Sequence, residues 1–193
     1  MQSSARRTTR IAPPPPAPEV SPPWSIVAVD PEGEGLATVH RWMNEPHVAE
    51  RWGQDWPLAE WAAEIAAQMK ADHCRPWLVR LDGVPVAYVE IYRVAADIIA
   101  DACPVDDGDL GMHIAIGVRH RTGKGLGTRV LHTVALGLFA ADPTCRRVLG
   151  DPEAGHAAAR RAFSAAGFAL LDEVDLPHKR AAIMAFHRPA GEP

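Results

Sequence analysis

The chain has few cysteines and no long apolar run. Its 193 residues include three cysteines, at positions 74, 103 and 145, which are far apart and form no CxxC pair. Such spacing favours neither a disulfide framework nor a zinc knuckle, so we expect three reduced thiols and no metal. No stretch approaches the roughly 18 consecutive apolar residues of a membrane span, and the N-terminus lacks the apolar core of a signal peptide. We therefore expect a cytoplasmic protein without a membrane span.

An excess of positive charge is also missing. The formal net charge is -4 at pH 7, whereas a nucleic-acid partner requires a basic face that neutralises several phosphates. Hydrophobic residues make up 47% of the chain, and at this length one domain buries roughly 70% of its unfolded surface. The composition favours one compact domain that acts on a small molecule, with no nucleic acid as partner.

The first 23 residues differ from the rest. "MQSSARRTTRIAPPPPAPEVSPP" is rich in Pro, Ser and Arg and has no periodic apolar residues. It lacks the apolar surface that would offset the entropy of ordering. We therefore predict a disordered tail at 1–23, a folded domain at 24–189 and a short tail at 190–193.

Hydrophobic periodicity in the remainder predicts alternating strands and helices. A DG pair at Asp82 and Gly83 predicts a hairpin turn, and Gly167 is placed to end a helix. Strands are expected at 24–29, 76–81, 84–94, 109–117, 145–151, 168–176 and 181–188, and helices at 34–44, 57–71, 125–140 and 153–167. This order predicts an α/β (α+β) fold with a mixed sheet covered by helices, and not a doubly wound parallel sheet.

A glycine-rich turn follows the strand expected at 109–117. "TGKGLG", at 122–127, precedes a helix whose first backbone N–H groups lack partners within that helix. Those N–H groups, the helix dipole and the cations Arg119, Arg121 and Lys124 form a natural seat for a pyrophosphate. The turn has neither the Gly-Lys-Ser/Thr of a Walker loop nor the placement of a Rossmann fingerprint. From these residues alone, a tight strand-to-helix connection without a ligand is an equal alternative.

The turn "RTGKGLGTRVL" and the later "GDPEAGHAAARRAFSAAGF" together resemble the acyl-CoA-binding core of the GNAT acyltransferase superfamily. The resemblance covers residues 24–189. It implies the GNAT fold, a mostly antiparallel central sheet flanked by helices, with an acyl-CoA cleft between the two central strands. It also implies acetyl-CoA or another acyl-CoA as co-substrate, with the pyrophosphate held by the turn amides.

The resemblance assigns one set of residues to the acyl-CoA. They are Ile116, Gly117, Val118, Arg119, Arg121, Thr122, Gly123, Lys124, Gly125, Leu126, Gly127, Thr128, His156, Arg160 and Phe163. The chain departs from the family pattern at Thr122, where Arg or Gln is usual, and at His156 and Phe163, where many members have Asn and Tyr. The turn can still act through its backbone, but a phenylalanine cannot protonate a leaving thiolate.

Three further segments, 41–61, 88–117 and 145–161, are similar to siderophore-pathway acyltransferases of the aerobactin and mycobactin type. Those enzymes acylate the side-chain nitrogen of lysine, ornithine or their N-hydroxy derivatives, which builds a hydroxamate. The resemblance makes His113 and Asp151 the catalytic or substrate-binding pair. A neutral imidazole near its reference pKa of about 6.5 accepts a proton at neutral pH, so we expect His113 to be the base. Asp151 would orient the acceptor nitrogen or the imidazole.

Six further residues are candidate contacts to the acceptor: Asn44, His47, Trp52, Trp56, Glu90 and Tyr92. Each candidate also has a structural interpretation. A strand histidine is commonly a half-buried packing residue, Asp151 before Pro152 is placed to cap a helix, and tryptophans serve in apolar cores. Asn44 and His47 lie where a helix stops and can simply fix that loop. Periodicity alone does not choose between these interpretations.

N-terminal acetylation of a peptide or protein stays open, and so do two other functions. An aminoglycoside N-acetyltransferase has a similar turn and helix pattern, and the acidic residues Asp106, Asp107 and Asp109 favour the negative pocket that it needs. The second is an acyl-CoA sensor with the same fold and no catalysis. The sequence leaves the acyl chain undetermined. It allows a monomer or a homodimer, with an edge strand at 181–187 available for pairing.

Overall fold

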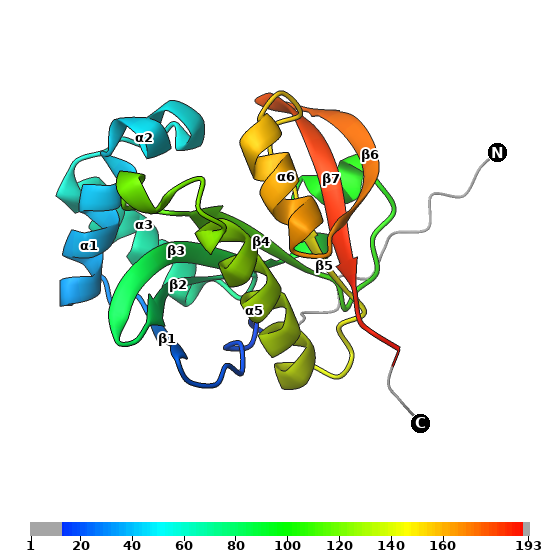
Figure 1. The fold of residues 1–193 in the computed structure, drawn as a ribbon, viewed down its shortest axis with the longest axis horizontal. Helices are drawn as coiled ribbons and strands as arrows, with labels where there is room; N and C mark the ends of the chain where they lie inside the picture. Colours follow the sequence, from blue (N-terminus) through cyan, green and yellow to red (C-terminus); the bar gives the residue numbers. More distant parts are fainter. Residues whose placement is uncertain (1–12, 191–193) are drawn as a thin grey trace.

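Seven strands form one sheet, and helices cover both of its faces (Figure 1). The computed structural model describes residues 13–190, so residues 1–12 of the tail predicted at 1–23 and residues 191–193 of the tail predicted at 190–193 lie outside the described residues. The strands are β1 (Trp24–Ala28), β2 (Cys74–Leu81), β3 (Val84–Arg93), β4 (Leu110–Ala115), β5 (Arg147–Gly150), β6 (Ala169–Leu176) and β7 (Lys179–His187). The helices are α1 (Glu34–Met43), α2 (Pro46–Trp52), α3 (Leu58–Lys70), α4 (Ile99–Ala102), α5 (Leu126–Ala141) and α6 (Ala157–Ala165). The predicted mixed α/β fold is confirmed.

The sheet opens between its two central strands. Its order is β1-β2-β3-β4-β5-β7-β6, and every neighbouring pair is antiparallel except β4 and β5. The register of these parallel strands pairs Leu110 with Val148 and Gly111 with Leu149. Beyond those pairs, β4 continues along β3 as far as Ala115. The two strands therefore separate toward their carboxyl ends.

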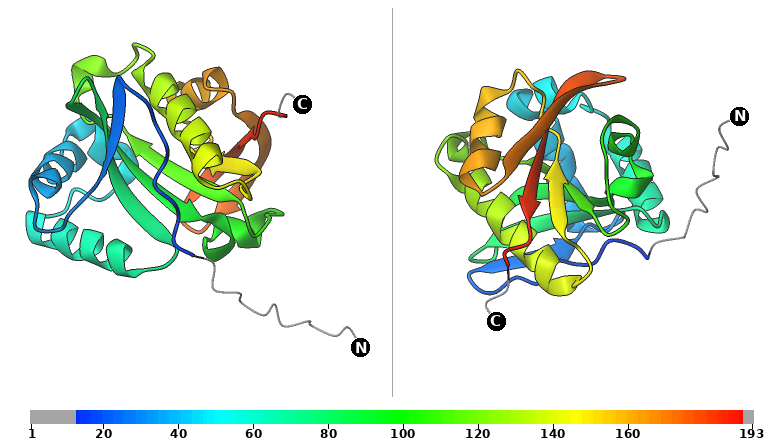
Figure 2. Two further views of the ribbon diagram at one scale, coloured as in Figure 1. Left: turned by 90° about the horizontal axis from the view of Figure 1, so that it is seen from below. Right: turned by 90° about the vertical axis from the view of Figure 1, so that its right-hand side faces the viewer.

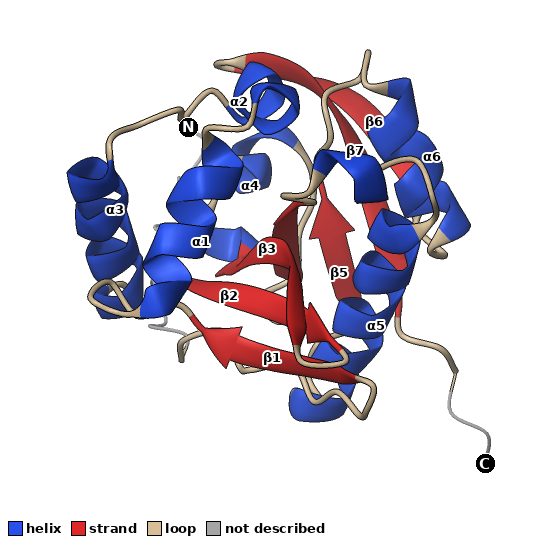
Figure 3. Ribbon diagram, turned by 60° about the vertical axis from the view of Figure 1, so that its left-hand side comes forward, coloured by secondary structure: helices blue, strands red, loops and turns tan. Residues whose placement is uncertain are grey.

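The two faces of the sheet pack against different helices. Val89, Ile91 and Met112 belong to the apolar core that includes α5 and α6, whereas Tyr88 packs with residues of α1, α2 and α3. Figures 2 and 3 show α5 on one side of the strands and α1 and α3 on the other. Because alternate strand residues share a face, Glu90 lies on the same face as Tyr88. This is the face on which the candidate site is built.

The helices α2 and α4 lie in segments where connections were expected. Pro46 begins α2, where its missing N–H is tolerated, and Gly53 ends it with a φ of +72°. The helix spans seven residues, and Val48 is its one fully buried side chain, so it is too short to produce a clear helical period. α4 is a single turn of four residues. In the described part of the chain, no helix is both long and apolar enough to span a membrane.

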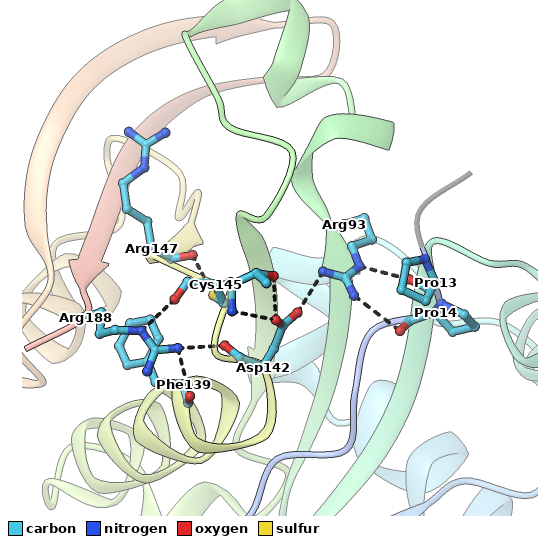
Figure 4. A network of polar contacts seen from close by, with 9 residues as sticks. Pro13, Pro14, Arg93, Phe139, Asp142, Cys145, Arg147 and Arg188 are labelled. Atoms are coloured by element: carbon cyan, nitrogen blue, oxygen red, sulfur yellow. Dashed lines mark hydrogen bonds and ion pairs between the residues drawn. The ribbon is translucent and has the colours of Figure 1, made fainter. Parts of the chain in front are cut away.

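Residues 13–23, called the strap below, lie against the domain, which differs from the expected tail. Arg93 Nε donates to the Pro13 carbonyl oxygen at 3.0 Å, and Nη2 donates to that of Pro14 at 3.5 Å. The same guanidinium pairs with Asp142, directly after α5, at 3.2 Å (Figure 4). Proline has a fixed φ and little side-chain entropy to lose, so a proline-rich segment is ordered at low entropic cost. Composition alone did not reveal this docking.

Candidate active site

His113 lies where β4 leaves β5. Its partner across the β3–β4 ladder is Glu90, and His113 Nδ1 lies 3.1 Å from Glu90 Oε2. His113 Nε2 lies 3.2 Å from Asp151 Oδ1, because Asp151 directly follows β5 and β5 begins beside β4. The structure thus brings His113 and Asp151 into direct contact and adds Glu90 on the other side of the ring.

The geometry determines the charge of His113. An ionised carboxylate only accepts hydrogen bonds, so a ring nitrogen that faces one carries a proton. Both ring nitrogens of His113 face a carboxylate, and both therefore carry a proton. Burial by itself lowers the pKa of His113, but the hydrogen bonds and charges of Asp151 and Glu90 outweigh burial and raise the pKa to about 10. The side chain is 35% exposed, so water screens part of this interaction. The expected neutral imidazole with a pKa near 6.5 is therefore corrected to an imidazolium.

Glu90 is buried and receives three donors. Its Oε1 accepts hydrogen bonds from Gln68 Nε2 at 2.8 Å and from the Tyr88 hydroxyl at 3.0 Å, in addition to the His113 contact on Oε2. Burial raises the pKa of Glu90, but His113, Gln68 and Tyr88 outweigh that effect and lower the pKa below its ordinary value. Glu90 is therefore an ionised group that holds one side of the imidazolium in place.

Asp151 is also buried and contacts a second cation. Lys179 Nζ lies 2.8 Å from Asp151 Oδ2, and the Tyr92 hydroxyl donates to Oδ1 at 3.4 Å. Burial raises the pKa of Asp151, but His113 and Lys179 outweigh it and hold the pKa well below its usual range. We call Glu90, His113, Asp151 and Lys179 the charge cluster.

Aromatic rings enclose the imidazolium. The Tyr92 ring centroid lies 4.7 Å from that of His113, and the Trp52 ring meets it edge-on at 6.0 Å. Tyr92 fits this position because Gly111 lies opposite it, where a Cβ would come within 2.2 Å of the Tyr92 ring. Trp52 also contacts Tyr88 at 5.9 Å. Tyr92 and Trp52 therefore contact the His113 ring from two directions.

The glycine turn lies between β4 and α5. Gly123 and Gly125 have φ angles of +69° and +78°, and Gly125 is the N-cap of α5. The Thr122 hydroxyl donates to the Arg119 carbonyl oxygen at 2.7 Å, so it fixes the turn. The first N–H groups of α5, which include those of Leu126, Gly127 and Thr128, have no intrahelical acceptor. A cavity of about 720 Å³ adjoins the turn and is lined by Arg41, Trp42, Glu45, Gly117, Val118, Arg119, His120 and Thr122.

Three of the expected acceptor contacts instead hold the corner between α1 and α3. His47 Nε2 lies 3.0 Å from the Ile116 carbonyl oxygen. Asn44 Nδ2 donates to the carbonyl oxygens of His40 at 2.9 Å and of Trp56 at 3.1 Å, and Trp56 packs against Trp61 at 5.5 Å. The structure therefore gathers Trp52, Glu90 and Tyr92 around His113, whereas Asn44, His47 and Trp56 tie the loops together.

The three candidates from the later helix have separate surroundings. His156 is the N-cap of α6, and burial together with nearby Arg51 lowers its pKa. Arg160 donates to the Ala154 carbonyl oxygen at 2.9 Å and to Glu173 at 2.8 Å. Phe163 is buried in the core, where its ring fills the space beside Gly150. The exposed cations Arg119 and Lys124 and half-buried Arg121 remain on the glycine turn.

Sequence reasoning missed three residues of the site: Gln68, Tyr88 and Lys179. Tyr88 had a signal, because it shares the alternating face of Glu90 and Tyr92 on β3. Gln68 on α3 and Lys179 on β7 had none, because their contacts with the site depend on how distant elements pack.

The acidic run that favoured an aminoglycoside pocket lies at the start of β4. Asp109 is fully buried, and Arg147 Nε donates to its Oδ1 at 3.2 Å. Asp106 lies 3.7 Å from Arg147 Nη2. These two carboxylates therefore link the beginnings of β4 and β5, where the strands are paired. They do not lie at the opening beside His113.

Comparison with known proteins agrees with this arrangement. Residues 32–176 match the family model described as an acetyltransferase (GNAT) domain. The lysine N-acyltransferase MbtK of Mycobacterium sp. (strain MCS) is 35% identical over 185 residues, which cover 95% of this chain and 75% of that protein. The N(6)-hydroxylysine O-acetyltransferase of Escherichia coli is 29% identical over 148 residues, or 77% of this chain and 47% of that protein. The aminoglycoside acetyltransferase AAC(6')-Ib, solved with coenzyme A, matches with a TM-score of 0.75 and 26% identity over 86% of this chain and 95% of that chain.

These matches and the geometry answer two of the questions that the sequence raised. The expected GNAT fold is confirmed by the family model and by the opening between β4 and β5. The expected acyl-CoA co-substrate is confirmed by the family and by the structural relative that holds coenzyme A. The chain belongs to the GNAT acetyltransferase family and is an acyl-CoA-dependent N-acyltransferase.

Proposed function

We propose that the chain transfers an acetyl or similar acyl group from CoA to the side-chain nitrogen of a lysine- or ornithine-type siderophore precursor. Where that nitrogen carries a hydroxyl group, the product is a hydroxamate. The observation that carries the proposal is the contact between His113 and Asp151 at the opening between β4 and β5. The relatives whose names specify lysine and N(6)-hydroxylysine support this class of acceptor.

The donor binds through the backbone of the glycine turn in this proposal. Gly123 and Gly125 have positive φ angles, and turns of this kind form concavities in which successive N–H groups bind an anion. The positive end of the α5 dipole favours a pyrophosphate there, and Arg119 and Lys124 are exposed beside it. A backbone site of this kind does not need the usual Arg or Gln at position 122.

The charge cluster supports both proton transfers of the reaction. The acceptor nitrogen attacks the thioester carbon, a C–N bond forms, and the C–S bond breaks. His113 gives a proton to the departing CoA thiolate, a step that Phe163 cannot perform, and the neutral imidazole that remains takes the proton that the nitrogen loses. The starting charges are thereby restored, while Asp151 stays ionised and orients the acceptor nitrogen and His113.

Thiol release in the presence of a panel of acceptors tests the proposal. The full chain is incubated with acetyl-CoA and either N6-hydroxylysine, N5-hydroxyornithine, lysine or kanamycin. We expect thiol release with a hydroxylated amino acid, and a product that forms a coloured complex with ferric iron. A hydroxamate binds iron through its N–O oxygen, whereas in the O-acyl isomer that oxygen is acylated and no longer serves as a donor. Turnover of kanamycin alone would establish an aminoglycoside enzyme instead. Acetyl-CoA binding with no thiol release from any acceptor would establish a sensor.

A further inference from the structure

Lys179 is the member of the charge cluster that the proposed reaction does not use. It begins β7, directly after the turn that follows β6. Its side chain is 24% exposed and contacts Asp151, whereas that of the next residue, Arg180, is 62% exposed and pairs with Glu173 at 3.4 Å. Successive residues of a strand point to opposite faces. Lys179 therefore faces the site, and Arg180 carries the same charge away from it.

The charge cluster is electrically balanced. Its two carboxylates are matched by an imidazolium and an ammonium. Two other carboxylates near the cluster are also engaged: Glu153 pairs with Arg51 at 3.2 Å, and Glu64 accepts a hydrogen bond from Gln68 at 3.0 Å. A second ammonium that entered the cluster would find Glu90 and Asp151 already paired with cations. Removing such an ammonium from water without a counter-charge is costly.

On the basis of the function proposed above, we propose that Lys179 determines acceptor specificity: it directs the site toward an uncharged N-hydroxylated amine and against an ordinary alkylammonium. An N-hydroxylated amine is weakly basic and is neutral at physiological pH, whereas the amine of a lysine substrate has a reference pKa of about 10.4 and is a cation. The hydroxylated acceptor brings N–H and O–H donors without a charge.

Asp151 retains the capacity to accept a hydrogen bond from such a donor. An ionised carboxylate offers about four acceptor positions, and Asp151 contacts Lys179, His113 and Tyr92. A neutral donor fills the remaining position while Lys179 stays in place. A lysine ammonium, in contrast, gains Asp151 as its counter-charge only by displacing Lys179.

The ratio of kcat/KM for N6-hydroxylysine to kcat/KM for lysine tests this role near neutral pH. It is measured with acetyl-CoA in the full chain and in Lys179→Gln, Lys179→Arg and Arg180→Gln. We expect wild type to prefer N6-hydroxylysine and Lys179→Gln to lower that ratio by about tenfold, the effect of one hydrogen-bonded charge, through a gain on lysine. Lys179→Arg should retain most of the preference. Arg180→Gln removes the same charge one residue away and should leave the ratio unchanged.

Two results would overturn the proposal: an unchanged ratio in Lys179→Gln, or a wild-type preference for lysine. A ratio is independent of the fraction of folded enzyme, so partial unfolding of a variant does not imitate a change in specificity. Equal losses with both acceptors leave the ratio unchanged and would make Lys179 a structural ion-pair partner only. Failure of the proposed function is distinct, because wild type then releases thiol with neither acceptor, and the specificity proposal falls with it.

Discussion

The imidazolium of His113 holds two buried carboxylates together, so its proton contributes to the stability of the fold. The pKa of a histidine in an unfolded chain is about 6.5, whereas that of His113 in the fold is about 10. A raised pKa gives stability that is fully present below about pH 6.5 and is lost as the pH rises through about 10. The free energy of unfolding should therefore decline over this range, and urea-unfolding curves measure it.

His113→Gln is the variant that isolates this effect. It leaves Glu90 and Asp151 without their shared cation, so we expect lower stability than wild type near pH 6 and a smaller decline toward pH 10. At acid pH the sign reverses for the two carboxylates. Their lowered pKa values give stability that is present above the unfolded values and lost as the pH falls through the folded ones. Equal alkaline slopes in wild type and variant would contradict the charge assigned to His113.

Single residues also mark the limit of what the sequence predicts about the site. The alternation of β3 made Glu90 and Tyr92 candidates without choosing their role, and the family resemblance made His113 and Asp151 the catalytic pair. The charge of His113 depends on β3 pairing with β4, which places Glu90 opposite it. Lys179 approaches Asp151 because β7 pairs with β5, and no local pattern carries that information.

At the scale of elements, the turn before α5 carries the proposed donor site. Gly125 has a φ of +78° and an open space around its missing Cβ, so Gly125→Ala introduces backbone strain of about 1–2 kcal/mol without a clash. We expect the dissociation constant for acetyl-CoA, measured by calorimetry, to rise by about tenfold. Gly155→Ala is the control, because Gly155 has an ordinary φ and equally open space. An affinity unchanged by Gly125→Ala would contradict pyrophosphate binding by this turn.

Helices and strands differ in how clearly the sequence predicts them. The strands at 76–81 and 84–94 were expected because each spans enough residues for alternation and a DG turn joins them. α2 and α4 were not expected, because a short helix with one buried side chain has almost no period. The opening between β4 and β5 came only from the family resemblance, since local periodicity does not tell where pairing stops.

In the molecule as a whole, the strap links the N-terminal part of the described chain to α5, because it packs against that helix. The Glu19 N–H donates to the Gly137 carbonyl oxygen at 3.0 Å, and a Cβ on Gly137 would lie 2.7 Å from the Glu19 carbonyl oxygen. Alanine usually stabilises a helix interior over glycine by about 1 kcal/mol. We expect the opposite here: Gly137→Ala should lower the melting temperature because the strap is displaced.

A second glycine of α5 provides the matched control for this reversal. At Gly127 the nearest heavy atoms to an added Cβ are 3.9 Å away, so Gly127→Ala should keep or raise the melting temperature. Scanning calorimetry of both variants tests the difference in sign. A higher melting temperature in Gly137→Ala would contradict the contact between the strap and α5.

In the proposed function, His113 and Asp151 together carry acyl transfer to a side-chain nitrogen. Asp151→Asn tests this most directly, because it preserves the shape of the side chain but removes the charge that orients His113 and the acceptor nitrogen. The measurement is kcat for thiol release with N6-hydroxylysine, together with the dissociation constant for acetyl-CoA. We predict that kcat falls by at least about 100-fold and that the dissociation constant stays within about twofold of wild type. A kcat within about threefold of wild type would contradict the claim.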